Sequence, residues 1–106
     1  MARHHFFLKL ISPRATFPAD MMEREKELLQ GHSRHMAAQF AAGKVLVYGP
    51  VMAVSGASGA AVWEVADEAE ARGLVEADPW VSGSMVTFEL SAMRVSGAQS
   101  SRARGA

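Results

Sequence analysis

The chain contains no cysteine and no excess of charge of either sign. Without cysteine it can form no disulfide, bind no metal through thiolates and use no thiol nucleophile. Lysine plus arginine and aspartate plus glutamate number 11 each, so the net charge is zero and no nucleic-acid partner is indicated. No stretch approaches the roughly 18 apolar residues of a transmembrane helix, so no membrane partner is expected.

Several functional motifs are missing as well. The stretch GASGAA (residues 56–61) lacks the ending of a phosphate-binding loop, and no serine lies in a Gly-x-Ser-x-Gly elbow. The paired aromatic signature of an RNA-recognition sheet is also missing. The first residues, MARHHFFLKLISPR, have a short apolar run that Lys9 interrupts, so they indicate a strand rather than a signal peptide. A cytoplasmic protein is therefore expected.

What the chain does contain is enough for one folded domain. Its 106 residues are 49% hydrophobic and 21% charged, which supplies both a core and a polar surface. We expect a domain over residues 1–95, followed by a flexible Ser/Gly/Arg tail over residues 96–106.

The apolar pattern predicts four strands. In His4–Ile11, the side chains of Phe6, Leu8 and Leu10 fall on one face by the period of two. Residues 52–59 are small and are expected to form a flexible turn or hairpin connection. The other predicted strands cover residues 44–51 and 60–66, and part of residues 84–94.

Two helices complete the pattern. At 100° per residue the first helix, after Pro18, has an apolar stripe of Met22, Leu29, Met36 and Phe40, flanked by Ala37. Gly31 within it could permit close packing, a bend or a break, and Gly43 is a good stop. The second helix is predicted over about residues 68–77, because Pro79 disfavours helical geometry at Asp78.

The order β-α-β-β-α-β predicts an α+β, ferredoxin-like fold. Its four-stranded antiparallel sheet would carry two helices on one face, with the first and third strands in the centre. The second face of the first strand is also partly apolar, through Phe7 and Ile11. Such a face suggests a covering partner, most simply a second copy of the chain in a homodimer.

His32 is the first candidate for chemistry. It lies on the shoulder of the helix stripe, where an imidazole can be partly desolvated and still move a proton. The alternative is a boundary histidine that donates to a backbone carbonyl. His35 points further from the stripe and is expected in solvent. The pair could also bind a metal, but no third ligand is evident, so no metal is predicted.

Asp78 is the second candidate. An aspartate before proline is commonly a local cap or turn residue. If it instead reaches His32, it would orient the imidazole and stabilise its protonated form. Trp80 beside it could wall a pocket or pack on the helix.

Two stretches resemble a known family. HSRHMAAQFAAGKVLVYGP (residues 32–50) and AAVWEVADEAEARGLVEADPWVSGSMVTFEL (residues 60–90) resemble the YciI-like, or YCII-related, family. The resemblance spans about residues 6–90. It implies a dimeric α/β barrel, in which two ferredoxin-like sheets pack face to face, and an active-site pair of His32 and Asp78. Some similar proteins act as lyases or dehydrochlorinases on hydroxylated aromatic compounds.

The leading functional hypothesis is a small cofactor-free enzyme of lyase or isomerase type. His32 would move a proton on a small aromatic or cyclic substrate, Asp78 would hold the working tautomer, and Tyr48, Gly49 and Trp80 would line the pocket. A non-catalytic ligand-binding or accessory domain would need the pocket but no proton transfer. A purely structural dimerisation unit would have no cavity, with His32 tied to a backbone carbonyl.

Overall fold

Seven elements follow one another along the chain, of which the computed structural model describes residues 3–99. They are β1 (His4–Ile11), α1 (Glu23–Ala41), β2 (Val45–Ala53), β3 (Gly56–Val65), α2 (Glu68–Glu76), α3 (Pro79–Ser82) and β4 (Thr87–Met93). The first strand coincides with its prediction, whereas the short helix α3 was not predicted. Residues 96–99 of the predicted tail are in neither helix nor strand, and the rest of that tail lies outside the described residues.

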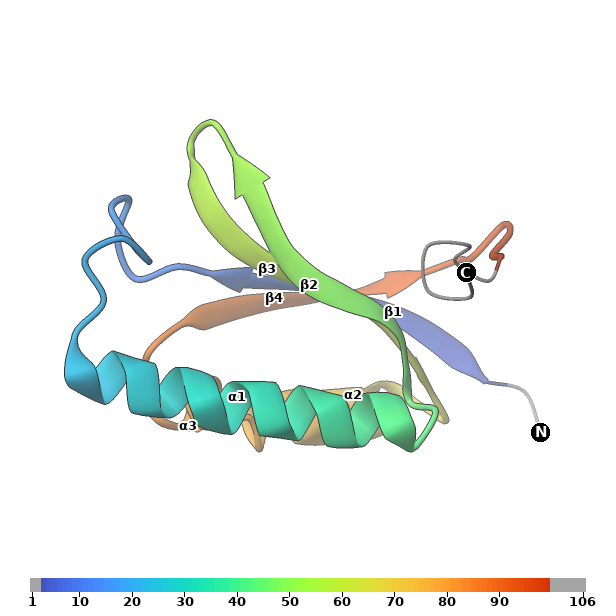
Figure 1. The fold of residues 1–106 in the computed structure, drawn as a ribbon. Helices are drawn as coiled ribbons and strands as arrows, with labels where there is room; N and C mark the ends of the chain where they lie inside the picture. The colour runs from blue at the N-terminus through green and yellow to red at the C-terminus, as the bar shows by residue number, and fades with distance from the viewer. Residues whose placement is uncertain (1–2, 100–106) are drawn as a thin grey trace.

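The four strands form one antiparallel sheet in the order β2-β3-β1-β4. All three helices lie on the same face of this sheet (Figure 1). The two central strands are β1 and β3, as the right-handed crossovers of this topology require. The predicted ferredoxin-like α+β arrangement is therefore confirmed.

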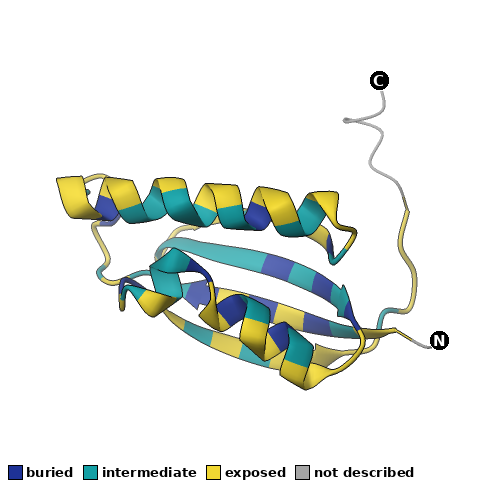
Figure 2. Ribbon diagram, turned by 90° about the horizontal axis from the view of Figure 1, so that it is seen from below, coloured by how far each residue is buried: buried dark blue, intermediate teal, exposed yellow. Residues whose placement is uncertain are grey.

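The core lies between the helices and the inner face of the sheet. Seen from the helix side, buried positions recur along the strands and on the sheet-facing sides of the helices (Figure 2). Phe6 pairs with Trp63 and Leu8 with Ala61, so the predicted alternation places both residues of each pair inward. Trp63 and Leu8 are almost fully buried. Burial of side chains of this size stabilises a fold by about 1.5–3 kcal/mol each.

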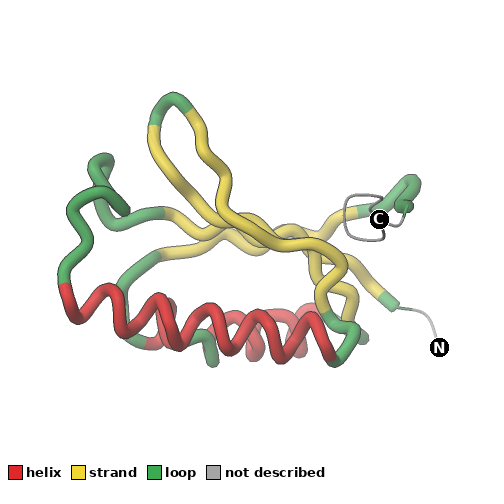
Figure 3. The backbone as a smooth tube through the Cα atoms, viewed as in Figure 1, coloured by secondary structure: helices red, strands yellow, loops and turns green. Residues whose placement is uncertain are grey.

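The β2–β3 hairpin is longer than predicted. Residues 52–59 are mostly strand rather than a flexible connection, because Met52 pairs with Ala57 and Ala53 with Gly56. Only Val54 and Ser55 remain as the turn, and Gly56 has φ of +132°, which glycine adopts without steric cost. The backbone shows this hairpin curling away from the helices (Figure 3). Small side chains do not prevent pairing, since the hydrogen bonds of a ladder come from the backbone.

The start of α1, and Ala37 further along it, also depart from the prediction. Met22 and Ala37 were expected on or beside the buried stripe, yet both are exposed, while Met36 is buried. Met22 lies just before the helix, and its backbone N–H donates to the Glu25 carboxylate at 2.8 Å. Glu25 takes the buried position of this turn because Arg14 pairs with it.

The other face of the sheet has no helix over it in the described part of the chain (Figure 1). Its exposed apolar side chains include Phe7, Val47 and Val51. The partly apolar second face expected for the first strand is thus present. None of the helices described for residues 3–99 is long and apolar enough to cross a membrane.

Candidate functional site

The site is built where α1 and α3 touch. Gly31 lies inside α1, which continues through it without a break. A Cβ at Gly31 would lie only 2.9 Å from the Cγ atom of Pro79, closer than real Cβ contacts allow. Of the three roles considered for this glycine, close packing is the one observed. This close packing brings the start of α3 against His32, the residue that follows Gly31 in α1.

Asp78 caps α3 and binds His32 at the same time. One carboxylate oxygen, Oδ1, accepts the backbone N–H of Trp80 at 2.9 Å, as an N-cap residue does. The other, Oδ2, lies 2.6 Å from Nδ1 of His32. Asp78 is only 2% exposed. The local role and the pairing role that the sequence left open are therefore combined, and each buried oxygen has a partner.

The hydrogen bond to Asp78 sets the tautomer of His32. A carboxylate can only accept, so Nδ1 carries the hydrogen and donates it. The second ring nitrogen, Nε2, is then left with a lone pair that can accept a proton. The carboxylate would also stabilise the imidazolium that results. This is the arrangement that general acid–base chemistry requires of a histidine.

Trp80 fixes the plane of the imidazole. The two rings are stacked, with centroids 4.3 Å apart and an interplanar angle of 11°. Phe17 meets the indole edge-on, with centroids 6.0 Å apart. His32 therefore has a carboxylate on one ring nitrogen and an aromatic face against its plane, which leaves its ring little freedom to rotate.

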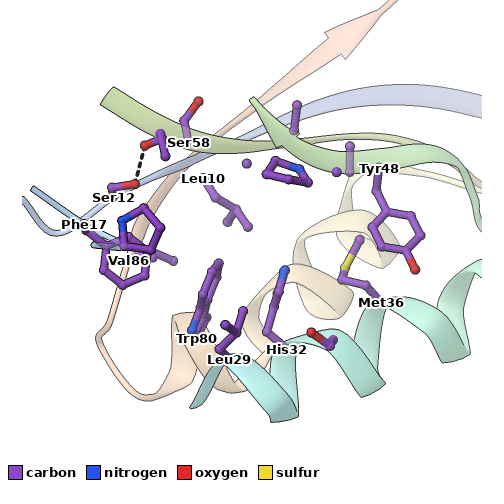
Figure 4. Close-up of a pocket in the computed structure, with 18 of the residues that line it drawn as sticks. Leu10, Ser12, Phe17, Leu29, His32, Met36, Tyr48, Ser58, Trp80 and Val86 are labelled. Atoms are coloured by element: carbon purple, nitrogen blue, oxygen red, sulfur yellow. Dashed lines mark hydrogen bonds between the residues drawn. The ribbon is translucent and has the colours of Figure 1, made fainter. Parts of the chain in front are cut away.

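A cavity of about 400 Å³ lies beside this pair, between α1 and the inner face of the sheet. His32, Tyr48, Gly49 and Trp80 all line it, whereas Asp78 is not among the described lining residues and reaches the cavity only through His32. Figure 4 shows Trp80 and His32 side by side, with Tyr48 and Phe17 on opposite sides of them. Except for His32, none of the lining residues in the described part of the chain is ionisable at neutral pH. A cavity of this composition suits a neutral ring better than a charged ligand.

His35 differs from its prediction. It is half-buried rather than solvent-exposed, and its Nε2 donates to the backbone carbonyl of Leu74 at 2.8 Å. The carbonyl-bound role considered for His32 is therefore taken by His35, one helical turn away. No group of three or more metal-ligating side chains gathers anywhere in residues 3–99.

Several lining residues were not anticipated from the sequence. The loop before α1 contributes Phe17 and Met21, and β3 contributes the small residues of GASGAA. A signal for the second group was present. Inward positions of β3 run from Trp63 to Ala61 and Gly59, so the side chains shrink and a hollow remains under the hairpin. Phe17 carried no such signal, because loop residues follow no period.

Comparison with known proteins agrees with this architecture. A similar solved structure is 5-chloro-2-hydroxyhydroquinone dehydrochlorinase (TftG) from Burkholderia phenoliruptrix AC1100, in complex with 2,5-dihydroxybenzoquinone. The TM-score is 0.58 and the identity 16%, over 84% of this chain and 93% of that chain. At this identity the likeness shows the fold. A search of curated proteins finds no match. The model of the YCII-related domain matches residues 6–94, and the chain therefore belongs to the YCII-related domain family.

Proposed function

We propose that the protein is a small lyase or isomerase in which His32 moves a proton on a hydroxylated aromatic ring. Nε2 of His32 accepts a proton from a C–H or O–H group of the substrate, and the imidazolium is held by Asp78. In an isomerisation the same nitrogen then returns the proton to another substrate atom. In an elimination the electron pair left on the substrate forms a double bond while the bond to the leaving group breaks, a group such as chloride departs as an anion, and Nε2 releases its proton to water. No cofactor takes part in these steps.

The observation that carries the proposal is the 2.6 Å contact between Nδ1 of His32 and Asp78, at the wall of an apolar cavity. Buried carboxylate–histidine pairs also occur in structural roles, but there the second nitrogen does not need to reach a ligand. Here His32 lines the cavity, and Trp80 holds the ring in place. Tyr48, Gly49 and Trp80 are proposed to contact the substrate.

The ring class is supported by the lining and by the structural neighbour. No lysine or arginine is among the described residues that line the cavity, which favours a substrate that is neutral when it binds, as phenols are near pH 7. The neighbour is named for a reaction on a chlorinated hydroxyhydroquinone and was solved with a dihydroxybenzoquinone. For this chain we propose only the class of hydroxylated aromatic rings, and not either of these compounds.

The test is turnover on a panel of hydroxylated and chlorinated hydroquinones, read by mass spectrometry in deuterated water. His32→Ala is expected to lower product formation and deuterium incorporation by at least about 10²-fold, the usual contribution of a general acid–base group. His35→Ala, one turn along the same helix, is the matched control and should keep its activity. Equal turnover in His32→Ala and the wild-type protein would contradict the proposed mechanism.

A non-catalytic ligand-binding domain is the second candidate. It is favoured by the largely apolar lining, in which His32 is the only side chain among the described residues that ionises near neutral pH. That protein would be stabilised thermally by members of the same panel without forming product. The dimerisation-unit hypothesis lacks support, since His32 binds Asp78 rather than a carbonyl and a cavity is present.

We also propose that the protein acts as a homodimer through the helix-free face of the sheet. Phe7, Val47 and Val51 are exposed there, and a second sheet would remove them from water. Val47→Asp is expected to shift the sedimentation coefficient to that of a monomer, and an unchanged dimer would contradict this interface. The cytoplasmic location stays a prediction.

A further inference from the structure

The loop between β1 and α1 is folded and anchored. Nη1 and Nη2 of Arg14 donate to the two carboxylate oxygens of Glu25, at 2.7 and 2.8 Å. Nε of Arg14 lies 3.0 Å from both carboxylate oxygens of Asp20, which also accepts the Thr16 hydroxyl at 2.6 Å. At the start of the loop, the Ser12 hydroxyl donates to the carbonyl of Ala57 in β3. The segment is thus tied to both walls of the cavity, the helix and the hairpin.

Phe17 is the side chain that this anchored loop presents to the cavity. It is 6% exposed although it lies outside any helix or strand. The guanidinium of Arg14 lies 5.7 Å from its ring centroid, and its ring meets Trp80 edge-on. In Figure 4 Phe17 marks the side of the cavity opposite Tyr48. A ring held between a paired arginine and an indole cannot swing aside without breaking both contacts.

We propose that Phe17 is the specificity-determining residue of the site, because it forms the wall that limits how far a ligand extends past Trp80. Arg14 is the positioning residue that holds this wall. The inference rests on the proposed function in taking the cavity as the ligand site and a hydroxylated ring as the ligand, and it requires no turnover. The ligand class it assigns is a hydroxylated ring whose substituent on the side facing Phe17 is short.

The test compares two neutral probes that share a phenol and differ in length, 4-methylphenol and 4-phenylphenol. Their dissociation constants are measured by isothermal titration calorimetry. Phe17→Ala is expected to shift the ratio of the two constants in favour of 4-phenylphenol by at least about tenfold, as changes in an apolar pocket do. Phe88→Ala is the matched control, because Phe88 packs against the core but is not among the described lining residues. It should leave the ratio unchanged.

Arg14→Lys separates positioning from stability. Lysine keeps the charge but not the planar fork that binds two carboxylates at once. We expect the ratio to move in the same direction as in Phe17→Ala, and by less. If Arg14 had only a structural role, Arg14→Lys would lower the melting temperature and leave the ratio of the two dissociation constants unchanged. That result would overturn the assignment of Arg14 as a positioning residue.

An unchanged ratio in folded Phe17→Ala would overturn the proposal for Phe17. If that variant does not fold, Phe17→Leu takes its place, with a smaller shift expected in the same direction and an unchanged ratio again decisive. Failure of both phenols to bind the wild-type protein would also overturn it. A protein that shows the shift but turns nothing over would disprove the proposed enzyme and leave this inference standing.

Discussion

Asp78 and Glu25 are both buried carboxylates that are paired with a basic side chain. The two pairs differ in whether that basic side chain can still exchange a proton. Asp78 binds Nδ1 of His32, a side chain that lines the cavity. Glu25 binds an arginine whose fork is engaged by Glu25 and Asp20 together. An arginine cannot release its proton near neutral pH, whereas a histidine can. The first pair is suited to moving a proton, and the second to holding a loop.

Substitution of Asp78 is expected to have the largest effect. Asp78→Ala leaves the Trp80 N–H and the His32 ring without their acceptor, which should cost about 1–3 kcal/mol of the free energy of unfolding. If the proposed function holds, turnover should fall by about 10²-fold or more, because the imidazole loses its fixed tautomer. Chemical denaturation and the panel assay measure the two losses.

Asp78→Asn then separates the two roles of this side chain. Asparagine is a good N-cap and can still accept from the Trp80 N–H, so most of the stability should remain. It carries no charge to stabilise an imidazolium, so turnover should still fall. Equal activity of Asp78→Asn and the wild-type protein would show that the pair does no more than hold the two helices together.

Gly31→Ala probes the contact that brings the first pair together. A methyl group at Gly31 would meet Pro79 at 2.9 Å, so α1 and α3 must shift relative to each other, which should disturb the contact between Asp78 and His32. Overpacking of this kind costs about 1–3 kcal/mol.

Gly73→Ala in α2 is its matched control, since no described atom other than its chain neighbours and the nearby backbone of its own helix lies within 4 Å of a Cβ there. That substitution should stabilise the protein by about 0.5–1 kcal/mol through helix propensity. Thermal unfolding of both variants tests the contrast, and similar shifts in the two would contradict the tight contact.

The second pair is expected to show its effect in acid. Hydrogen bonds from Arg14, and then from the Met22 N–H, hold the pKa of Glu25 at about 2, below its ordinary 4.5. Because the folded pKa is the lower one, the carboxylate stabilises the fold fully above pH 4.5, and this stabilisation is lost as the pH falls toward 2.

The measurement is the free energy of unfolding of Glu25→Gln and of the wild-type protein across this range. The wild-type protein should be the more stable above pH 4.5, and the gap should close toward pH 2. Glu23→Gln, in the same turn but exposed, is the control for loss of a carboxylate from this turn, and its free energy of unfolding near neutral pH should stay within about 0.5 kcal/mol of the wild-type value. A constant gap for Glu25→Gln would contradict the shifted pKa.

The two pairs were not equally visible in the sequence. Asp78 could be considered for His32 because a helix stop, a proline and a family resemblance all pointed at that position. The partnership of Arg14 and Glu25 had no such signal. Glu25 occurs in a charged run, EREKE, that reads as solvent-facing, yet it is one of the two buried polar residues found among those described. A charge is buried when a partner satisfies it, and the partner here comes from a loop.

The sequence alone determined the order of the four strands and the two longer helices, the inward faces of the central strands and the positions where those two helices stop. These features depend on neighbours a few residues apart, which the periods of 2 and 3.6 record. Only the tertiary structure decided that Asp78, 46 positions from His32, meets it at Nδ1, and that Phe17 closes one side of the cavity. Such contacts depend on how closely whole elements approach, and a missing Cβ at Gly31 or a paired arginine in a loop leaves no periodic trace.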